Sequence, residues 1–373
     1  MIKVLADKNL YKIKDFLPDN IDLSLFDPSD ADLYLDADTD ALLVRTVISL
    51  NEKTIPIIPR QLRFIGTGSS GRDHIDTDYF ENKGVKVVDA KGCNANAVAE
   101  YVITALLLWE IANPEQHSFK KVGVIGAGAT GSKVIEKLDA FGIKWVAYDP
   151  PRQEKDSSFT SATKEELLQC PILTFHIPLT KTGPYPTKYW LNKEILEQYS
   201  FDLVINAARG GVIDEKSLLN AFRQKSVKNF ILDVWENEPD FNPEMAHSAF
   251  LATPHIAGYS EQAKLNASRM LGVQLSDFFG LIPKHSTELY HLKTIDLAHI
   301  NFSQEDLLHR LQPIREYDAA LRDLINRPDK TALFRKLRID RPYRYEFPFV
   351  RIREDVLEKL GTLQKLGVKA QNK

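Results

Sequence analysis

The chain has 373 residues, and 48 Lys and Arg against 51 Asp and Glu give it a formal net charge of −3 at pH 7. An apolar fraction of 43% is enough to build a core in each of about two or three domains, which excludes a largely disordered chain, and the balanced charge gives no electrostatic reason to expect a nucleic-acid partner. Two cysteines are too few for a disulfide framework, and no signal peptide begins at Met1, so we expect a reduced, cytoplasmic compartment.

The N-terminal ninety residues predict a first parallel sheet. Short apolar runs, each too brief for a stable helix, are the candidate strands: 2–6, 41–44, 63–65 and 85–88. Helix-like segments separate them, as in an α/β unit. A long apolar helix follows at 95–111. It is too short to span about 30 Å of hydrocarbon and contains Glu100, so we expect a buried helix and no membrane span.

A second series of strands and helices then begins. Its candidate strands are 122–125, 145–148, 172–175, 203–205, 230–234 and 250–252. Helical patterns fill the gaps, for example at 132–141 and 215–223. This repetition is typical of a doubly wound nucleotide-binding sheet. An amphipathic helix at 260–281 follows the last strand, and we expect it to cross back to the first domain.

Beyond Pro283 the pattern changes. Residues 286–300 are predicted to form a connector and about 304–325 a single helix. From 341 to 350, aromatic side chains alternate with polar residues or Pro, which predicts a strand with one apolar face. Interleaved Arg and aromatic residues are also found in RNA-binding segments, but the half-buried strand of a small α+β domain, used as a subunit contact, is the favoured interpretation.

A glycine motif at the start of the second series indicates a dinucleotide site. Gly126, Gly128 and Gly131 have G-x-G-x-x-G spacing, directly after an apolar strand and at the start of a helix. Gly126 allows the tight turn, Gly128 lets the backbone approach a pyrophosphate, and Gly131 lets the helix pack closely on the strand. The N–H groups at the helix N-terminus would bind the phosphates.

An acidic residue closes the next strand. Asp149 lies 18 residues after Gly131, where a carboxylate would hold the ribose diol and repel a 2′-phosphate. This favours NAD over NADP. Arg152, three residues later, leaves NADP open.

Three polar residues follow three later strands. Arg209 could clasp a carboxylate, His255 could take a hydroxyl proton while a hydride leaves the neighbouring carbon, and Glu238 could orient the imidazole and stabilise its charged form. Each alone has a plainer interpretation as a structural ion pair, a loop histidine or a surface acid. Their order after a glycine motif favours catalysis. No H-x-x-H or C-x-x-C spacing calls for a metal, and no G-x-S-x-G indicates a serine hydrolase.

Taken together, these motifs resemble the D-isomer-specific 2-hydroxyacid dehydrogenases. The resemblance covers roughly residues 1–281 and is carried by segments 92–95, 149–152, 175–179, 183–185, 233–236 and 253–259. Two segments, Gly183-Pro184-Tyr185 and the sequence His-Ile-Ala-Gly-Tyr at 255–259, resemble a subfamily that acts on a phosphorylated 2-hydroxy acid. Members of that subfamily carry an extra C-terminal domain that serves dimerisation.

The resemblance implies roles for individual residues. Arg209 and Glu238 act in catalysis, and His255 is the proton donor or acceptor. Besides the three glycines, the residues placed against NAD are Ala129, Thr130, Asp149, Ile177, Ala207, Ala208, Asp233 and Gly258. Those placed against the substrate are Thr46, Thr67 and Tyr259. Arg45 is a further candidate for a substrate phosphate or carboxylate, with a surface ion pair equally open.

The resemblance and the chain pattern together predict a fold. We expect two doubly wound parallel-sheet domains of the Rossmann or flavodoxin-like kind, plus a small C-terminal α+β domain. Their expected limits are 1–93 with 259–285 for substrate binding, 94–258 for NAD binding, and 286–373 for homodimerisation. Two other functions stay open at this point: turnover of a different 2-hydroxy acid, such as phosphoglycerate, glyoxylate or hydroxypyruvate, and NAD sensing without turnover.

Overall fold

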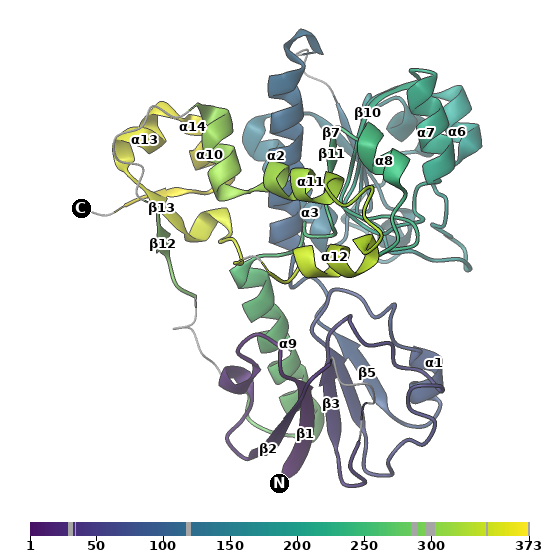
Figure 1. Ribbon diagram of the computed structural model, residues 1–373, viewed down its shortest axis with the longest axis vertical. Coiled ribbons are helices and arrows are strands. Elements are labelled where there is room, and N and C mark those ends of the chain that lie inside the picture. The colour runs from purple at the N-terminus through teal and green to yellow at the C-terminus, as the bar shows by residue number, and fades with distance from the viewer. Residues whose placement is uncertain are drawn as a thin grey trace. The chain divides into compact units, whose positions relative to one another are not determined.

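The computed structural model describes residues 1–28, 33, 35–116, 121–284, 290–295, 303–340 and 342–371. Its contacts divide the chain into two compact units. Unit 1 comprises Met1–Asn94 and Ser260–His291, and unit 2 comprises Ala95–Tyr259 and Leu292–Lys373. Each unit has a parallel sheet of its own (Figure 1).

The sheet of unit 1 has five parallel strands in the order β2-β1-β3-β4-β5. The strands are β1 Ile2–Asp7, β2 Ile21–Phe26, β3 Ala41–Val44, β4 Phe64–Thr67 and β5 Lys86–Asp89. The central strands β3 and β4 are buried along their whole length, which explains their continuous apolar runs. The helices of this unit are η1 Ile13–Phe16, α1 Thr77–Glu81 and α9 Glu261–Phe279.

Helix α9 completes the core of unit 1. The side chain of Ser260 caps its first turn by accepting a hydrogen bond from the N–H of Ala263, and Gly280 ends it in the left-handed conformation at φ 66°. Leu271 and Leu275 pack into the cluster that holds Val4. The helix predicted at 260–281 therefore packs on the first sheet, as expected.

Unit 2 has six parallel strands in the order β11-β10-β9-β8-β6-β7. The strands are β6 Val122–Ile125, β7 Trp145–Tyr148, β8 Ile172–Phe175, β9 Phe201–Asn206, β10 Val227–Leu232 and β11 Leu251–Ala252. Strand order reverses between β6 and β8, and in doubly wound sheets ligands bind at that switch point, beyond the carboxyl ends of the strands.

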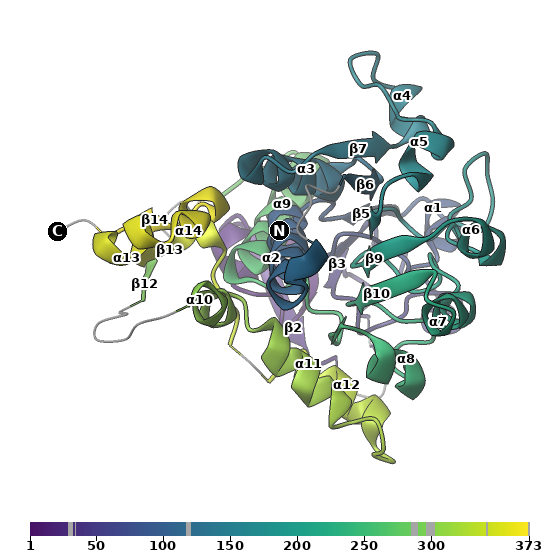
Figure 2. The ribbon, with the colours of Figure 1, turned by 90° about the horizontal axis from the view of Figure 1, so that it is seen from above.

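Both faces of this sheet are covered. On β8, Ile172 belongs to one apolar cluster and Leu173 to another, because neighbouring residues of a strand face opposite sides. Figure 2 shows α2 and α3 on one side and α6, α7 and α8 on the other. The helices of this part are α2 Ala95–Ala112, η2 Pro114–Gln116, α3 Ala129–Phe141, α4 Pro150–Gln153, α5 Lys164–Leu168, α6 Lys193–Gln198, α7 Glu215–Arg223 and α8 Pro243–Ser248. The prediction of two doubly wound parallel sheets is confirmed.

The C-terminal segment of unit 2 packs on both of these faces. Its elements are β12 Lys293–Thr294, α10 Gln304–Leu311, α11 Ile314–Arg322, α12 Lys330–Leu337, η3 Phe347–Phe349, β13 Val350–Ile352, α13 Glu354–Lys359, α14 Gly361–Leu366 and β14 Lys369–Ala370. Leu308 of α10 joins the cluster around α2, whereas Phe334 of α12 joins the cluster on the opposite face. By contacts, this segment groups with residues 95–259. The division into three domains, 1–93 with 259–285, 94–258 and 286–373, stays a prediction.

Two local predictions need correction. The helix expected at 304–325 is two helices, because Pro313 has no N–H to donate within a continuous helix. The strand expected at 341–350 is an extended stretch and then η3, and only 350–352 pair as β13; Arg341 lies outside the described residues. Strand β2 was not predicted. The expected connector at 286–300 falls largely on residues that are not described.

Helix α2 is long and apolar enough to cross a membrane by length and composition, but 78% of its apolar window is buried inside the fold. It packs against α3 and α10. This agrees with the prediction of a buried helix.

A buried ion pair joins α2 to the C-terminal segment. Arg344 Nη1 lies 2.6 Å from Glu100 Oε2, and their side chains are 8% and 0% exposed. Glu100 Oε1 also accepts hydrogen bonds from Phe347 N and Asn96 Nδ2. Burial raises the pKa of Glu100 to about 7, although the charge of Arg344 acts to lower it. Arg344 and Glu346, two polar residues of the expected strand, are therefore turned toward the protein interior.

Replacing Arg344 by Ala should lower the free energy of unfolding by about 3–5 kcal/mol, because it leaves a buried carboxylate without its partner. Urea denaturation measures this loss. The control is Lys193→Ala, which removes an ion pair to Glu197 whose side chains are 70% and 61% exposed and should leave the midpoint unchanged. Equal effects of the two variants would contradict the structural role of the pair.

Candidate active site

Every candidate residue for cofactor binding and catalysis in unit 2 lies at or beyond the carboxyl end of a strand. Because the six strands are parallel and adjacent, these ends share one edge of the sheet. The glycine loop follows β6 and Asp149 follows β7, on one side of the switch point. Across it, β8, β9, β10 and β11 are followed in turn by Ile177, Arg209, Glu238 and His255.

The glycine loop has a shape that larger residues could not keep. Gly126 turns the chain with φ 88°, and a Cβ on Gly131 would lie 1.8 Å from the carbonyl oxygen of Gly126. Helix α3 therefore begins in close contact with the end of β6. A Cβ on Gly128 would meet no protein atom within 4 Å, so the loop is open at that point.

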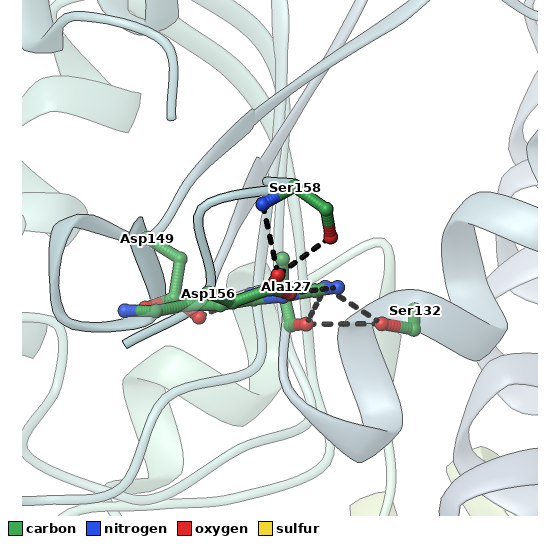
Figure 3. Close-up of polar contacts among 6 residues, drawn as sticks. Ala127, Ser132, Asp149, Asp156 and Ser158 are labelled. Carbon is green, nitrogen blue, oxygen red and sulfur yellow. Dashed lines mark hydrogen bonds and ion pairs between the residues drawn. The ribbon is translucent and has the colours of Figure 1, made fainter. Parts of the chain in front are cut away.

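Asp149 ties the end of β7 to this loop. Its Oδ2 accepts a hydrogen bond from Ala127 N at 2.8 Å, and its Oδ1 accepts one from Arg152 N at 3.0 Å, which caps α4 (Figure 3). The guanidinium of Arg152 donates to Ala127 O and to Asp156 Oδ2. Arg152 is thus occupied in holding the loop from the other side, and its charge is balanced by Asp156.

These features fit a dinucleotide. Ala129 and Thr130 are the first residues of α3, where backbone N–H groups of a helix have no intrahelical acceptor and attract phosphate. The open surface at Gly128 leaves room for a pyrophosphate to approach. The Asp149 carboxylate at the next strand end is placed for a ribose diol, with Arg152 already paired.

The segment after β8 lies against the glycine loop. The carbonyl oxygen of His176 would be 2.6 Å from a Cβ on Gly126, and the Cγ2 of Ile177 equally close. Burial lowers the pKa of His176 to about 3, so the ring is neutral near neutral pH. Its Nε2 contacts Thr174 Oγ1 at 3.0 Å. This histidine is therefore a packing residue and no acid or base. Ile177 lies beside the glycine loop and stays a predicted cofactor contact.

The turn that carries Arg209 is shaped by the last residue of β9. The Asn206 side chain donates to Arg209 O at 3.0 Å and accepts from Ala208 N at 3.1 Å, which fixes the turn through Ala207. The following glycine packs directly on the next strand end, since a Cβ on Gly210 would lie 1.8 Å from the Trp235 carbonyl oxygen. Arg209 is thereby held beside the segment that follows β10.

The carboxylate of Asp233 organises the loop that bears His255, the predicted acid or base. It is 1% exposed and accepts hydrogen bonds from Thr253 Oγ1, Ile256 N and Ala257 N at 2.7, 2.7 and 2.9 Å. His255 N donates to Asp233 O at 2.7 Å. Burial raises the pKa of Asp233, against the lowering by the charge of His255 and by these hydrogen bonds. The structure thus gives Asp233, expected to contact the cofactor, an internal clamping role.

Around this carboxylate lies a buried network that sequence reasoning missed. Thr253 donates its hydroxyl proton to Asp233, so the hydroxyl of Tyr101, 2.7 Å from Thr253 Oγ1, must donate to Thr253. Trp235 Nε1 donates to the carbonyl oxygen of Thr253 at 2.9 Å. A polar Thr directly after an apolar strand is the one available signal, and Tyr101 lies too far away in sequence to be linked with it.

His255 and Glu238 form a hydrogen-bonded pair. His255 Nδ1 lies 2.8 Å from Glu238 Oε2, and the other oxygen of Glu238 accepts from Trp235 N at 2.9 Å. Burial acts to raise the pKa of Glu238, but His255, Trp235 N and Arg338 together lower it below its usual value. The carboxylate is therefore ionised and can only accept, so the ring proton of neutral His255 is on Nδ1 and Nε2 has its lone pair available.

The candidates for substrate contact fall in different parts of the chain. Tyr259, in unit 2, follows His255 by four residues and is half-buried beside Gly258. The others belong to unit 1. Thr67 is buried, and its hydroxyl contacts Ser69 Oγ and His74 Nε2, while Thr46 is exposed. Arg45 Nε lies 2.8 Å from Asp7 Oδ2, whose carboxylate is fully buried, so Arg45 takes part in an ion pair.

Two acidic residues, Glu215 at the start of α7 and Glu236 after β10, are hydrogen-bonded to each other's backbone. Glu215 Oε1 accepts from Glu236 N at 2.6 Å, and Glu236 Oε1 accepts from Glu215 N at 3.1 Å. Burial, and then the charges of Glu236 and Glu238, raise the pKa of Glu215 to about 7 against the hydrogen bond from Glu236 N. In the described part of the chain, no three His, Cys, Asp or Glu side chains are grouped to hold a metal ion.

Two variants of the glycine loop after β6 test separately whether its backbone shape and its open surface at Gly128 are needed for binding the dinucleotide. Gly131→Ala should lower both the thermal midpoint and the affinity for NADH, because its Cβ collides with the Gly126 carbonyl. Gly128→Ala should keep the midpoint but weaken binding about tenfold or more, since its Cβ points into the space left for the pyrophosphate. Fluorescence titration with NADH measures the affinity. The control is Gly361→Ala, whose Cβ meets no atom within 4 Å and which should change neither. Wild-type affinity in Gly128→Ala would contradict this placement.

The raised pKa of Glu215 predicts a pH dependence of stability. Between its usual value of 4.5 and about 7, the folded protein holds a proton that the unfolded chain releases, so stability falls as pH rises through this interval, by up to about 1.4 kcal/mol per pH unit. Glu215→Gln should flatten this slope and raise the urea midpoint at about pH 8. A slope identical to that of the wild type would show that Glu215 stays ionised.

Comparison with known proteins agrees with this geometry. Residues 109–257 match the model of the D-isomer specific 2-hydroxyacid dehydrogenase, NAD binding domain. The matched family domain binds NAD, so the cofactor is NAD. The chain is similar to an NADPH-dependent glyoxylate/hydroxypyruvate reductase from Sinorhizobium meliloti, with a TM-score of 0.62, 21% identity, and coverage of 76% of this chain and 97% of that one. At this identity the likeness shows the fold alone.

Two relatives are similar over nearly their whole length. An erythronate-4-phosphate dehydrogenase from Psychromonas ingrahamii is 34% identical, with 90% of this chain and 89% of that protein covered. One from Yersinia enterocolitica is 32% identical, over 99% of this chain and all of that protein. The chain belongs to the erythronate-4-phosphate dehydrogenase family, a branch of the D-isomer specific 2-hydroxyacid dehydrogenases.

Proposed function

We propose that this protein oxidises 4-phospho-D-erythronate to (R)-3-hydroxy-2-oxo-4-phosphobutanoate with NAD, as a step in the biosynthesis of pyridoxal 5′-phosphate. The observation that carries the proposal is the hydrogen-bonded pair of His255 and Glu238, whose Nδ1 and Oε2 atoms are 2.8 Å apart. This pair and Arg209 follow neighbouring strands at the same edge of the sheet. The similarity to relatives named erythronate-4-phosphate dehydrogenase supports the choice of substrate. When bound, NAD supplies the acceptor for the hydride from C2.

His255 would take the proton from the C2 hydroxyl. Its Nδ1 hydrogen is directed at the ionised Glu238, so Nε2 is the nitrogen available to accept. The same carboxylate stabilises the imidazolium that results, because opposite charges at hydrogen-bond distance attract strongly in a partly buried site. In the reverse direction the protonated ring would return the proton from Nε2.

Arg209 would hold the substrate carboxylate. A guanidinium binds a carboxylate through two parallel hydrogen bonds, which fixes the orientation of the neighbouring carbon as well as its charge. The turn made by Asn206 and the close packing of Gly210 on Trp235 support that orientation. By resemblance, Thr46, Thr67 and Tyr259 would add further substrate contacts, and Arg45 stays a candidate for an anionic group.

Two further proposals rest on the same resemblance. We expect the chain to form a homodimer through residues 286–373, and a monomeric mass in sedimentation would contradict this. We also expect a cytoplasmic location, because Cys93 and Cys170 are buried and form no disulfide in the described part of the chain, as suits a reducing compartment. Fractionation that recovers the protein outside the cytoplasm would contradict it.

The test is an absorbance assay for NADH with 4-phospho-D-erythronate and NAD. Wild-type protein should form NADH, and His255→Ala should lower turnover by about 10²–10⁴ while the affinity for NAD stays the same. His247→Ala, at an exposed histidine of α8, is the matched control and should behave as wild type. Unchanged turnover in His255→Ala would remove the mechanism. Turnover only on unphosphorylated 2-hydroxy acids, or NAD binding with no turnover, would replace the proposed function.

A further inference from the structure

The C-terminal segment brings one arginine to the catalytic loop of unit 2. Arg338 follows α12 directly, and its Cζ lies 5.4 Å from the centroid of the Tyr259 ring. It is half-buried, and its Nε is fully buried. Within the described ranges, its guanidinium has no hydrogen-bond or ion-pair partner. A planar cation stacked on an aromatic ring keeps its donor edge available for an anion.

Other arginines of the same segment are paired. Arg322 bonds Asp318, Arg327 bonds Asp329, and Arg344 bonds Glu100. Arg335, three residues before Arg338 and within α12, is exposed to solvent. Arg338 differs because its guanidinium is half-buried and, in the described part of the chain, forms no hydrogen bond or ion pair with a side chain. A guanidinium whose donors are unused can bind an anion through charge-assisted hydrogen bonds.

The position of Arg338 relates it to the catalytic pair. Tyr259, on which it stacks, is four residues beyond His255. Its positive charge also acts on Glu238, where it is one of the groups that lower the carboxyl pKa. The guanidinium therefore lies within electrostatic range of the residues that would handle the C2 hydroxyl. All of these residues belong to unit 2.

We propose that Arg338 binds the phosphate group of the substrate and thereby selects phosphorylated over unphosphorylated 2-hydroxy acids. This inference rests on the proposed function, in which the substrate has a carboxylate at C1 and a phosphate at C4. Arg209 is assigned to the carboxylate, so the second anionic group requires another cation. Arg338 meets this requirement because it lies beside Tyr259 and its guanidinium forms no hydrogen bond or ion pair among the described residues.

The experiment compares two substrates, 4-phospho-D-erythronate and D-erythronate, with wild type, Arg338→Ala, Arg338→Lys and the control Arg335→Ala. Arg338→Ala should raise the KM for the phosphorylated substrate about 10–100-fold with kcat changed by less than about threefold, because a charge-assisted bidentate contact is lost. Its KM for D-erythronate should rise far less, because that substrate has no phosphate for the guanidinium to bind. Arg338→Lys, which keeps the charge without the planar fork, should be intermediate, and Arg335→Ala should match wild type.

A second measurement probes the phosphate contact directly. Inorganic phosphate should compete with 4-phospho-D-erythronate, and its inhibition constant should rise in Arg338→Ala by a factor similar to that of KM. If Arg338→Ala does not fold, as judged by its thermal midpoint, Arg338→Gln replaces it.

Three outcomes would overturn the inference: an unchanged KM, an equal rise for both substrates, which would indicate that Arg338 only supports Tyr259, or an unchanged inhibition constant for phosphate. A wild-type protein that forms no NADH from 4-phospho-D-erythronate would instead contradict the proposed function.

Discussion

Hydrogen bonds to the buried carboxylate of Asp233 stabilise the loop of unit 2 that carries His255. His255 has a φ of 56°, a conformation that costs a non-glycine residue on the order of 1–2 kcal/mol. The hydrogen bonds from Thr253, Ile256 and Ala257 to Asp233 offset this cost, because each satisfies a group that would otherwise be buried unpaired. The loop is thereby fixed in the one shape that directs His255 Nδ1 at Glu238. Geometry at the imidazole therefore depends on a carboxylate that solvent hardly reaches.

The buried strands and the glycine turns were predictable from the sequence. The edge strand β2 and the irregular stretch before η3 were not. Strands such as 122–125 and 172–175 are continuous apolar runs, because helices cover both faces of their sheet. Strand β2 was missed although Ile21-Asp22-Leu23-Ser24-Leu25 alternates, since an edge strand buries only part of one face and its signal is weak. The stretch before η3 was read as amphipathic because nothing local reveals that Arg344 pairs with Glu100, far away in the chain.

The positions of the candidate site residues were predictable where each of them follows a strand. Arg209, Glu238 and His255 follow β9, β10 and β11, and the rule that parallel strands end at one edge brings them together without knowledge of side-chain contacts. The rule fails for partners from other elements. Tyr101 lies on α2 and Arg338 after α12, and neither stands in a motif. Asp233 illustrates a different limit: its place at a strand end was correct, but its three internal hydrogen bonds could not be read from spacing.

The covering of α2 sets a constraint on how the chain is made. Leu307, Leu308 and Phe347, which shield its apolar side chains, belong to the last fifth of the polypeptide. During synthesis α2 leaves the ribosome long before those residues do. Part of its apolar surface therefore stays exposed to water until translation is nearly finished. Exposed apolar surface of this kind attracts other chains and chaperones. Premature termination upstream of α10 would therefore yield a product prone to aggregate, even with its nucleotide-binding strands complete.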